Sequence, residues 1–202
     1  MQLDVGPSPC WSELLERHLV LVFTGRVRLA RHLLQNVVRQ WYAGDAAVVD
    51  CFRQLVVNAE RCADVLRAAP ADARLVRLGH AVDVYWAQKK TLAPGSQPPS
   101  VIRSPSLFDS RDPVTWSVFY KKKLTKQVGV LMERLRPLVH GQSLTGAGGG
   151  GFYFGLLRDP RDRPRVASVA AEIDAAMTLH DVSVDRTGLQ LVVDGRPIHI
   201  GT

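Results

Sequence analysis

The chain is organised around Ser143-Leu144-Thr145-Gly146-Ala147-Gly148-Gly149-Gly150-Gly151-Phe152-Tyr153-Phe154. Five of the six residues from 146 to 151 are glycine. Glycine costs backbone entropy on folding, but it permits positive φ and lets other groups approach the main chain closely. Successive N–H groups exposed in such a turn can form a concave anion site. With a helical pattern before it and the apolar residues 152–157 after it, the run predicts a tight helix-to-strand loop.

Two known phosphate-binding loops provide a comparison. A P-loop needs a lysine and then serine or threonine after its last glycine, and neither follows Gly151. The letters Gly146-x-Gly148-x-x-Gly151 satisfy the dinucleotide-binding pattern. That pattern requires a strand before the glycines and a helix after them, which is the reverse of the order expected here. A glycine-rich hairpin or a close backbone crossing without a ligand therefore stays open as an alternative.

The composition is that of a globular protein. With 202 residues, one domain is the first expectation and two are possible. Hydrophobic residues make up 46% of the chain, enough for a sizeable core. No apolar run has the length needed to span a membrane, and residues 1–13 lack a charged start followed by an apolar block. We therefore expect no membrane association, no signal peptide and a cytoplasmic location.

The formal net charge of +7 is compatible with nucleic acid, an acidic surface or a phosphorylated ligand. The basic residues are scattered, and only Lys121-Lys122-Lys123 form a run, without an aromatic-rich nucleic-acid module around them. A solvated basic face is the favoured interpretation, so nucleic-acid binding is the least favoured function.

The three cysteines do not form a disulfide framework or a metal site. Cys51 and Cys62 are expected on one helix, where eleven residues correspond to about 16 Å, too far for a disulfide. Together with Cys10 they show no metal-ligand spacing, so no metal site is proposed. Reduced cysteines are typical of the cytosol.

Hydrophobic periodicity predicts an α+β fold, with an antiparallel sheet packed by several amphipathic helices. A buried strand is expected at 19–23, followed by helices at 27–43, at 46–68 with Asp45 as N-cap, and from about 72 to before Pro94. A fourth helix is expected at 124–138, ended or kinked by Pro137. After the glycine run we expect a strand at 152–157, a helix at 165–178 with Ala176 facing inward, and a hairpin of 182–184 with 189–193.

Residues 94–117 contain five prolines among Ser, Arg and Asp, which predicts a long loop. We expect a Pro-rich loop or insertion at 98–123. Its composition also raises the hypothesis of alternative splicing or of an error in the gene model.

Residues 144–152 resemble the third motif of the GHMP kinase superfamily. Four further phrases resemble its L-fucose kinase branch: residues 21–31, 86–90, 93–95 and 140–144. The resemblance covers about residues 11–97 and 130–202, while 1–10 and 98–129 fit poorly. It implies a C-terminal GHMP-kinase-like domain at 11–202, preceded by a poorly assigned segment at 1–10.

This resemblance implies ATP-dependent phosphorylation of a sugar's anomeric hydroxyl, with ATP and Mg²⁺ as cofactors and a nucleotide and a small sugar as partners. It also implies that the glycines of the loop line the active-site cleft: Gly146, Gly148, Gly149, Gly150 and Gly151. The superfamily's main phosphate loop, Pro-x-x-x-Gly-Leu-Gly-Ser-Ser, does not occur in these 202 residues. The chain is therefore expected to be incomplete without an N-terminal kinase half, which also carries the expected acidic catalytic residue.

Residues outside the glycine run are further candidates for anion binding or proton transfer. Thr24 and Arg28 lie where a strand passes into a helix, a position that favours anions. The alternative is that Thr24 caps the helix and Arg28 is solvated. Lys89 is a candidate for the ATP or substrate cleft, like Thr24 and Arg28. The alternative is that Lys89 and Lys90 only end a helix, where cations are favourable without any ligand. His140 is either a proton shuttle or a hydrogen-bonded structural residue.

The leading functional hypothesis is therefore the C-terminal part of a sugar kinase resembling L-fucokinase. The alternative is a catalytically silent truncated isoform that acts as a binding or regulatory module.

Overall fold

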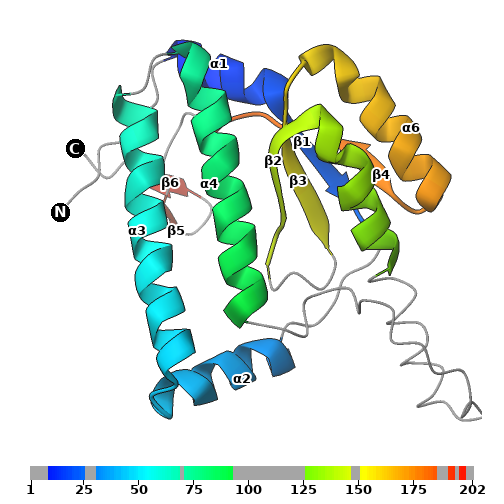
Figure 1. Ribbon diagram of the computed structural model, residues 1–202. Coiled ribbons are helices and arrows are strands. Elements are labelled where there is room, and N and C mark those ends of the chain that lie inside the picture. The colour runs from blue at the N-terminus through cyan, green and yellow to red at the C-terminus, as the bar shows by residue number, and fades with distance from the viewer. Residues whose placement is uncertain are drawn as a thin grey trace, which may run out of the picture.

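The computed structural model of the chain describes residues 9–25, 31–68, 71–92, 126–146, 151–185, 191–193 and 196–198 (Figure 1). The Pro-rich loop expected at 98–123 lies outside these residues. Among the described helices, none combines the length and the apolar character that crossing a bilayer requires.

A four-stranded antiparallel sheet is the centre of the fold, with the order β2-β3-β1-β4. Its strands are β1 (Leu19–Phe23), β2 (Val139–Leu144), β3 (Phe152–Leu157) and β4 (Thr178–His180). β1 lies between β3 and β4, with Leu21 opposite both Phe154 and His180. A separate two-stranded sheet pairs β5 (Leu191–Val193) with β6 (Arg196–Ile198). The α+β class predicted from the sequence is confirmed.

Helices lie around this sheet (Figure 1). They are α1 (Pro9–His18), α2 (Arg31–Tyr42), α3 (Ala46–Ala68), α4 (Ala71–Leu92), the helical residues 126–135 and α6 (Arg163–Ile173). α3 and α4 lie side by side, and α4 packs along β2. Asp45 caps α3, since its Oδ1 accepts from the N–H groups of Ala47 and Val48 at 3.0 and 3.1 Å. The predicted strand at 19–23 and the predicted helix at 46–68 are confirmed.

The main core lies on one face of the sheet. Val20 and Val22 alternate with half-buried residues along β1, and Tyr153 of β3 stands opposite Val22 on the same face. The helical residues 126–135 and α6 cover this face with apolar side chains: Val128, Leu131, Leu135, Val166, Val169 and Ala170. Side chains on one face recur every second residue along a strand and every three to four residues along a helix. These apolar residues therefore meet between the sheet and the helices.

The glycine run does not connect a helix to a strand, contrary to the prediction. After the helical residues 126–135, a short 3₁₀ turn over Arg136–Leu138 contains Pro137, and β2 follows at once. The sequence 139–144 contains only one β-branched residue and a glycine, so its intrinsic strand preference is low. Pairing with β3 on one side and packing of α4 on the other stabilise it as a strand.

Two predictions near the C-terminus are also wrong. The last helix ends at Ile173, and Ala176 is exposed in a turn in which its N–H donates to Asp174 Oδ1 at 3.0 Å. Residues 182–184 form no strand, and the N–H of Val184 donates to the Glu16 carboxylate at 2.7 Å. β5 pairs instead with β6, with Val192 opposite Pro197.

α4 packs closely against the outer edge of β2. A Cβ added at Gly141 would overlap the carbonyl group of Gly79, so the helix and the strand touch through their main chains. Asp83 Oδ1 accepts from the outward N–H of Gln142 at 3.1 Å, and Lys89 Nζ donates to the outward carbonyl of Leu144 at 2.5 Å. α4 therefore satisfies polar groups that an open sheet edge would leave unpaired.

Substitution of Gly79 by alanine tests this contact. Alanine raises helix propensity by about 1 kcal/mol. We nevertheless expect a net loss of about 2 kcal/mol in the free energy of unfolding, because the new Cβ would lie 2.5 Å from Cβ of His140. Urea unfolding measures this difference. Ala59→Gly, at an exposed position of α3, reports helix propensity alone, and a stabilised Gly79→Ala variant would contradict the close packing.

Candidate functional site at the glycine loop

The glycine loop lies at one end of the four-stranded sheet, between β2 and β3 (Figure 1). The N–H of Thr145 donates to the carbonyl of Phe152 at 2.8 Å and closes the hairpin. β1 ends at the same end of the sheet, because it runs antiparallel to β3 with Phe23 opposite Phe152. Residues from β1, from the hairpin and from the last turn of α4 therefore meet here.

Thr24 holds the second end of the loop. Both its N–H and its hydroxyl donate to the carbonyl of Gly151 at 2.8 Å, and the residue is fully buried. The hydroxyl of Thr24 thus contacts the glycine loop, whereas the N–H groups that it would cap belong to residues 26–30, outside the described residues. The next residue, Gly25, has φ +80°, and an added Cβ would lie 3.0 Å from Cβ of Ala176. This geometry requires glycine for both conformation and space.

The two described glycines of the loop have left-handed backbone conformations. Gly146 has φ +59° and Gly151 has φ +85°. A Cβ at Gly146 would meet no atom within 4 Å, so conformation and not crowding requires glycine there. Backbone groups at this position are thus accessible without a covering side chain. Gly148, Gly149 and Gly150 lie outside the described residues, as does Arg28.

Lys89 is buried beside the first end of the loop, with only 8% of its surface exposed. Its ammonium donates to the carbonyl of Leu144 and lies 5.3 Å and 5.8 Å from the ring centroids of Tyr85 and Trp86. Burial disfavours the charged form and lowers the pKa of Lys89 from its ordinary value of 10.5 to about 8. Lys89 is therefore not a solvated helix-terminal cation. Lys90 lies in the next position, half-buried, with Nζ 5.9 Å from the centroid of Trp86.

Aromatic residues that sequence reasoning did not select line the same end of the sheet. The rings of Phe23 and Phe152 lie 5.2 Å apart, and Phe152 meets His180 edge-on at 5.5 Å. His180 Nε2 lies 2.9 Å from the hydroxyl of Thr178. Alternation along β1 and β3 puts both phenylalanines on the face opposite Val22, a placement that only the strand register makes visible.

A groove of about 740 Å³ runs between α4 and the helical residues 126–135. Trp86 and Met132 provide apolar surface, and Gln142 of β2 provides an amide. Its charged side chains include Asp83 and Arg136, which form an ion pair at 2.7 Å, and also Lys90 and Glu133. The groove therefore combines a small apolar surface with several charged and hydrogen-bonding side chains.

A chain of buried hydrogen bonds links β2 to β3 and to the helical residues 126–135. Tyr153 Oη donates to Gln142 Oε1 at 3.1 Å, and Gln142 Nε2 donates to the carbonyl of Met132 at 2.9 Å. Burial raises the pKa of Tyr153, so its hydroxyl stays protonated and donates. Sequence reasoning missed this chain, since no local pattern relates these residues.

His140 lies in β2 near the end distant from the glycine loop. Its side chain is half-buried, and burial lowers its pKa, with smaller contributions from Arg158 and His18. His140 therefore lies at the other end of β2 from the glycine loop, away from Thr24 and Gly151.

Among the described residues, no group of three or more His, Cys, Asp or Glu side chains forms a possible metal site. Cys51 and Cys62 are free thiols.

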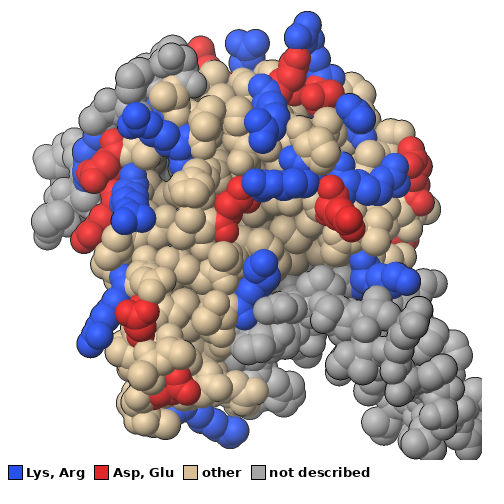
Figure 2. Space-filling model, in the orientation of Figure 1, with Lys and Arg blue, Asp and Glu red and all other residues tan. Residues whose placement is uncertain are grey.

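Charges of both signs are interspersed on the face shown in Figure 2. Arg134 pairs with Glu172 at 2.6 Å, and Arg136 pairs with Asp83. The described part of this face therefore offers no continuous basic surface of the kind that binds nucleic-acid phosphates. The Lys121-Lys122-Lys123 run lies outside the described residues.

The environment of Lys89 predicts a specific pH dependence. Between pH 8 and 10.5 the unfolded chain holds this proton and the folded chain releases it, so stability rises with pH. In Lys89→Met this rise in the free energy of unfolding, about 3 kcal/mol between the two pKa values, should disappear. Urea unfolding at several pH values measures it. Lys90→Met is the matched control and should keep the wild-type slope, and equal slopes in all three proteins would contradict the buried charge.

The hydroxyl of Thr24 is expected to stabilise the loop. Thr24→Val keeps the shape but removes the donor to Gly151, which should cost about 1 kcal/mol of stability. Amide exchange at residues 151–153 should quicken at the same time. Thr24→Ser keeps the hydroxyl and serves as the control. Unchanged exchange in the valine variant would show that the backbone bond from Thr24 alone secures the loop.

No family model matches this sequence. The chain is similar to a bifunctional fucokinase/GDP-fucose pyrophosphorylase of Arabidopsis thaliana, with 28% identity over 162 residues. The match covers 79% of this chain and 12% of the plant enzyme, so the chain spans about an eighth of that protein. This distant similarity supports a relationship with fucokinase-containing enzymes.

Proposed function

We propose that this chain is the C-terminal part of an ATP-dependent sugar kinase of the L-fucokinase type. Its reaction would transfer the γ-phosphoryl group of ATP to the anomeric hydroxyl of L-fucose, giving L-fucose 1-phosphate and ADP. The observation that carries the proposal is the convergence of Thr24, Lys89, Gly146 and Gly151 at one end of the sheet. The similarity to the plant fucokinase over 162 residues supports it independently.

In this proposal residues 11–202 form one GHMP-kinase C-terminal-like domain, with an insertion at 98–123. Gly146 and Gly148–Gly151 line the substrate cleft, and Arg28 contributes a positive charge. Phosphoryl transfer depends on positioning and on stabilisation of phosphate charge, usually with Mg²⁺. Accessible backbone donors at the loop and cations beside it suit that chemistry.

Lys89 has a positioning role in this proposal. Its ammonium is already bonded to Leu144 and enclosed by two aromatic rings. It fixes the backbone from which the loop departs and adds positive potential there. The groove between α4 and the helical residues 126–135 is lined by Lys90 and Gln142, which lie close in sequence to Lys89 and Leu144. Its tryptophan and its hydrogen-bonding side chains suit a small polyhydroxylated substrate.

The second candidate is a catalytically silent binding or regulatory module. It is favoured by the absence of a Gly-Leu-Gly-Ser-Ser run from the 202 residues, because the principal phosphate loop of the superfamily would have to come from elsewhere. Under the first proposal, that loop belongs to an N-terminal kinase half. The two candidates differ in whether this domain supports turnover when such a half is supplied.

A segment exchange tests the proposal. The matching 162-residue segment of the plant enzyme is replaced by this chain, and ADP release from ATP and Mg²⁺ is measured with and without L-fucose. We expect sugar-dependent ADP release from the chimera and none from the isolated chain. Gly151→Ala in the chimera should lower kcat about tenfold or more, because its φ of +85° strains any other residue.

Gly44→Ala is the control for this substitution, since Gly44 also has positive φ (+71°) but lies between α2 and α3. A folded chimera that retains its pyrophosphorylase activity but releases no ADP with L-fucose would exclude the kinase proposal and favour the silent module.

A further inference from the structure

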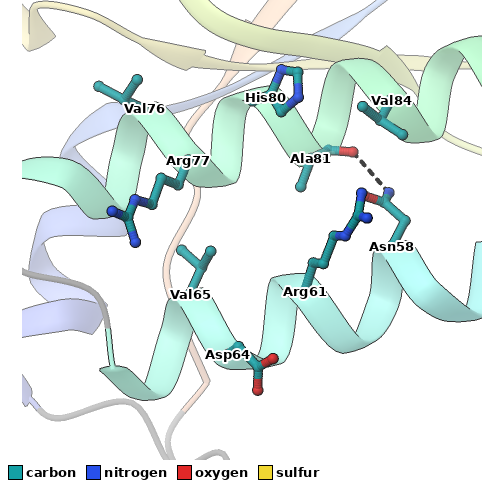
Figure 3. Close-up of a pocket in the computed structure, with 9 residues that line it drawn as sticks. All are labelled: Asn58, Arg61, Asp64, Val65, Val76, Arg77, His80, Ala81 and Val84. Atoms are coloured by element: carbon teal, nitrogen blue, oxygen red, sulfur yellow. Dashed lines mark hydrogen bonds between the residues drawn. The ribbon is translucent and has the colours of Figure 1, made fainter.

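The groove between α3 and α4 is a second candidate binding surface, separate from the glycine loop (Figure 3). It encloses about 540 Å³, and its apolar lining comes from Val65, Val76, Ala81 and Val84. Asn58 is buried at its base, and its Nδ2 donates to the carbonyl of Ala81 at 2.9 Å. This bond ties the two helices together, so the groove is preformed.

The apolar surface continues beyond the groove on α3. Val57 precedes Arg61 and Val65 at four-residue spacing on α3, so these side chains follow one face. Val57 is 44% exposed and Val76 is 52% exposed. β-branched residues are weaker helix formers than leucine or alanine, so helix stability does not explain valines at exposed positions. Contiguous exposed apolar surface of this kind marks interaction sites.

The charge of the groove is positive. Figure 3 shows the guanidinium groups of Arg61 and Arg77 between the two helices, one from each side. Neither arginine forms an ion pair with any residue that the structure describes. The acidic residue of the lining, Asp64, already pairs with Arg67 at 3.3 Å. Two guanidinium groups beside an apolar floor are complementary to carboxylates flanking an apolar stripe.

We propose that the α3–α4 groove docks an acidic amphipathic helix of a partner protein. Apolar side chains spaced three and four residues apart on that helix would enter the groove, and its flanking carboxylates would pair with Arg61 and Arg77. The groove involves α4 from Val76 to Val84, whereas the glycine loop meets α4 at Lys89. Docking therefore leaves the loop accessible, and this inference does not depend on the proposed kinase function.

The test uses a fluorescein-labelled helical peptide with leucines at i, i+4 and i+7 flanked by glutamates. A matched peptide carries lysines in place of the glutamates. Fluorescence anisotropy with the full 202-residue chain should show tighter binding of the glutamate peptide. Arg61→Glu/Arg77→Glu should weaken that binding about tenfold or more and should strengthen binding of the lysine peptide. Both arginines are exposed, so the double variant should fold, and circular dichroism checks this.

Arg165→Glu is the control, because Arg165 is an exposed cation of α6 that does not line the groove. It should bind the glutamate peptide like the wild type. Equal binding of the two peptides, or equal losses in Arg165→Glu and in the double variant, would overturn the proposal. Sedimentation velocity adds a further outcome. Dimerisation that the double variant abolishes would assign the groove to a second copy of the chain instead.

Discussion

The contact between α4 and the outer edge of β2 is the constraint on which the rest of the structure depends. Gly79 and Gly141 let the main chains touch, and Asp83 and Lys89 satisfy one N–H and one carbonyl of the strand. β2 has little strand preference of its own, so this contact helps define its position and register. The glycine loop begins where β2 ends, and its position follows from the same contact.

The two ends of the loop are secured by chemically different donors. A buried ammonium holds the carbonyl of Leu144, and a buried hydroxyl and N–H hold the carbonyl of Gly151. Burying a charge is costly unless it is compensated, and the lowered pKa of Lys89 expresses that cost. Residues with shifted pKa values concentrate at functional sites. The proposed kinase role would give this buried cation a function beyond its bond to Leu144.

α4 connects the two surfaces that emerge from the structure. Its last turn supports the glycine loop, while its first half forms one wall of the positively charged groove with α3. Val57 and Val76 are exposed at and beside the groove, and Arg61 and Arg77 form no ion pair with any residue that the structure describes. The two proposals thus place small-molecule chemistry at the last turn of α4 and partner binding along its middle.

The sequence alone determined the elements whose signals are local. The helix at 46–68, its Asp45 cap and the strand at 19–23 follow from signals within each segment. These are helical periodicity, a capping residue after Gly44 and a short apolar run rich in β-branched residues. Only the tertiary structure decided that 139–144 is a strand and that β5 pairs with β6. It also decided that Lys89 is buried. Lys89 and Leu144 lie 55 residues apart, and Thr24 and Gly151 lie 127 apart. Contacts over such separations depend on how the helices and strands pack, which no local pattern encodes.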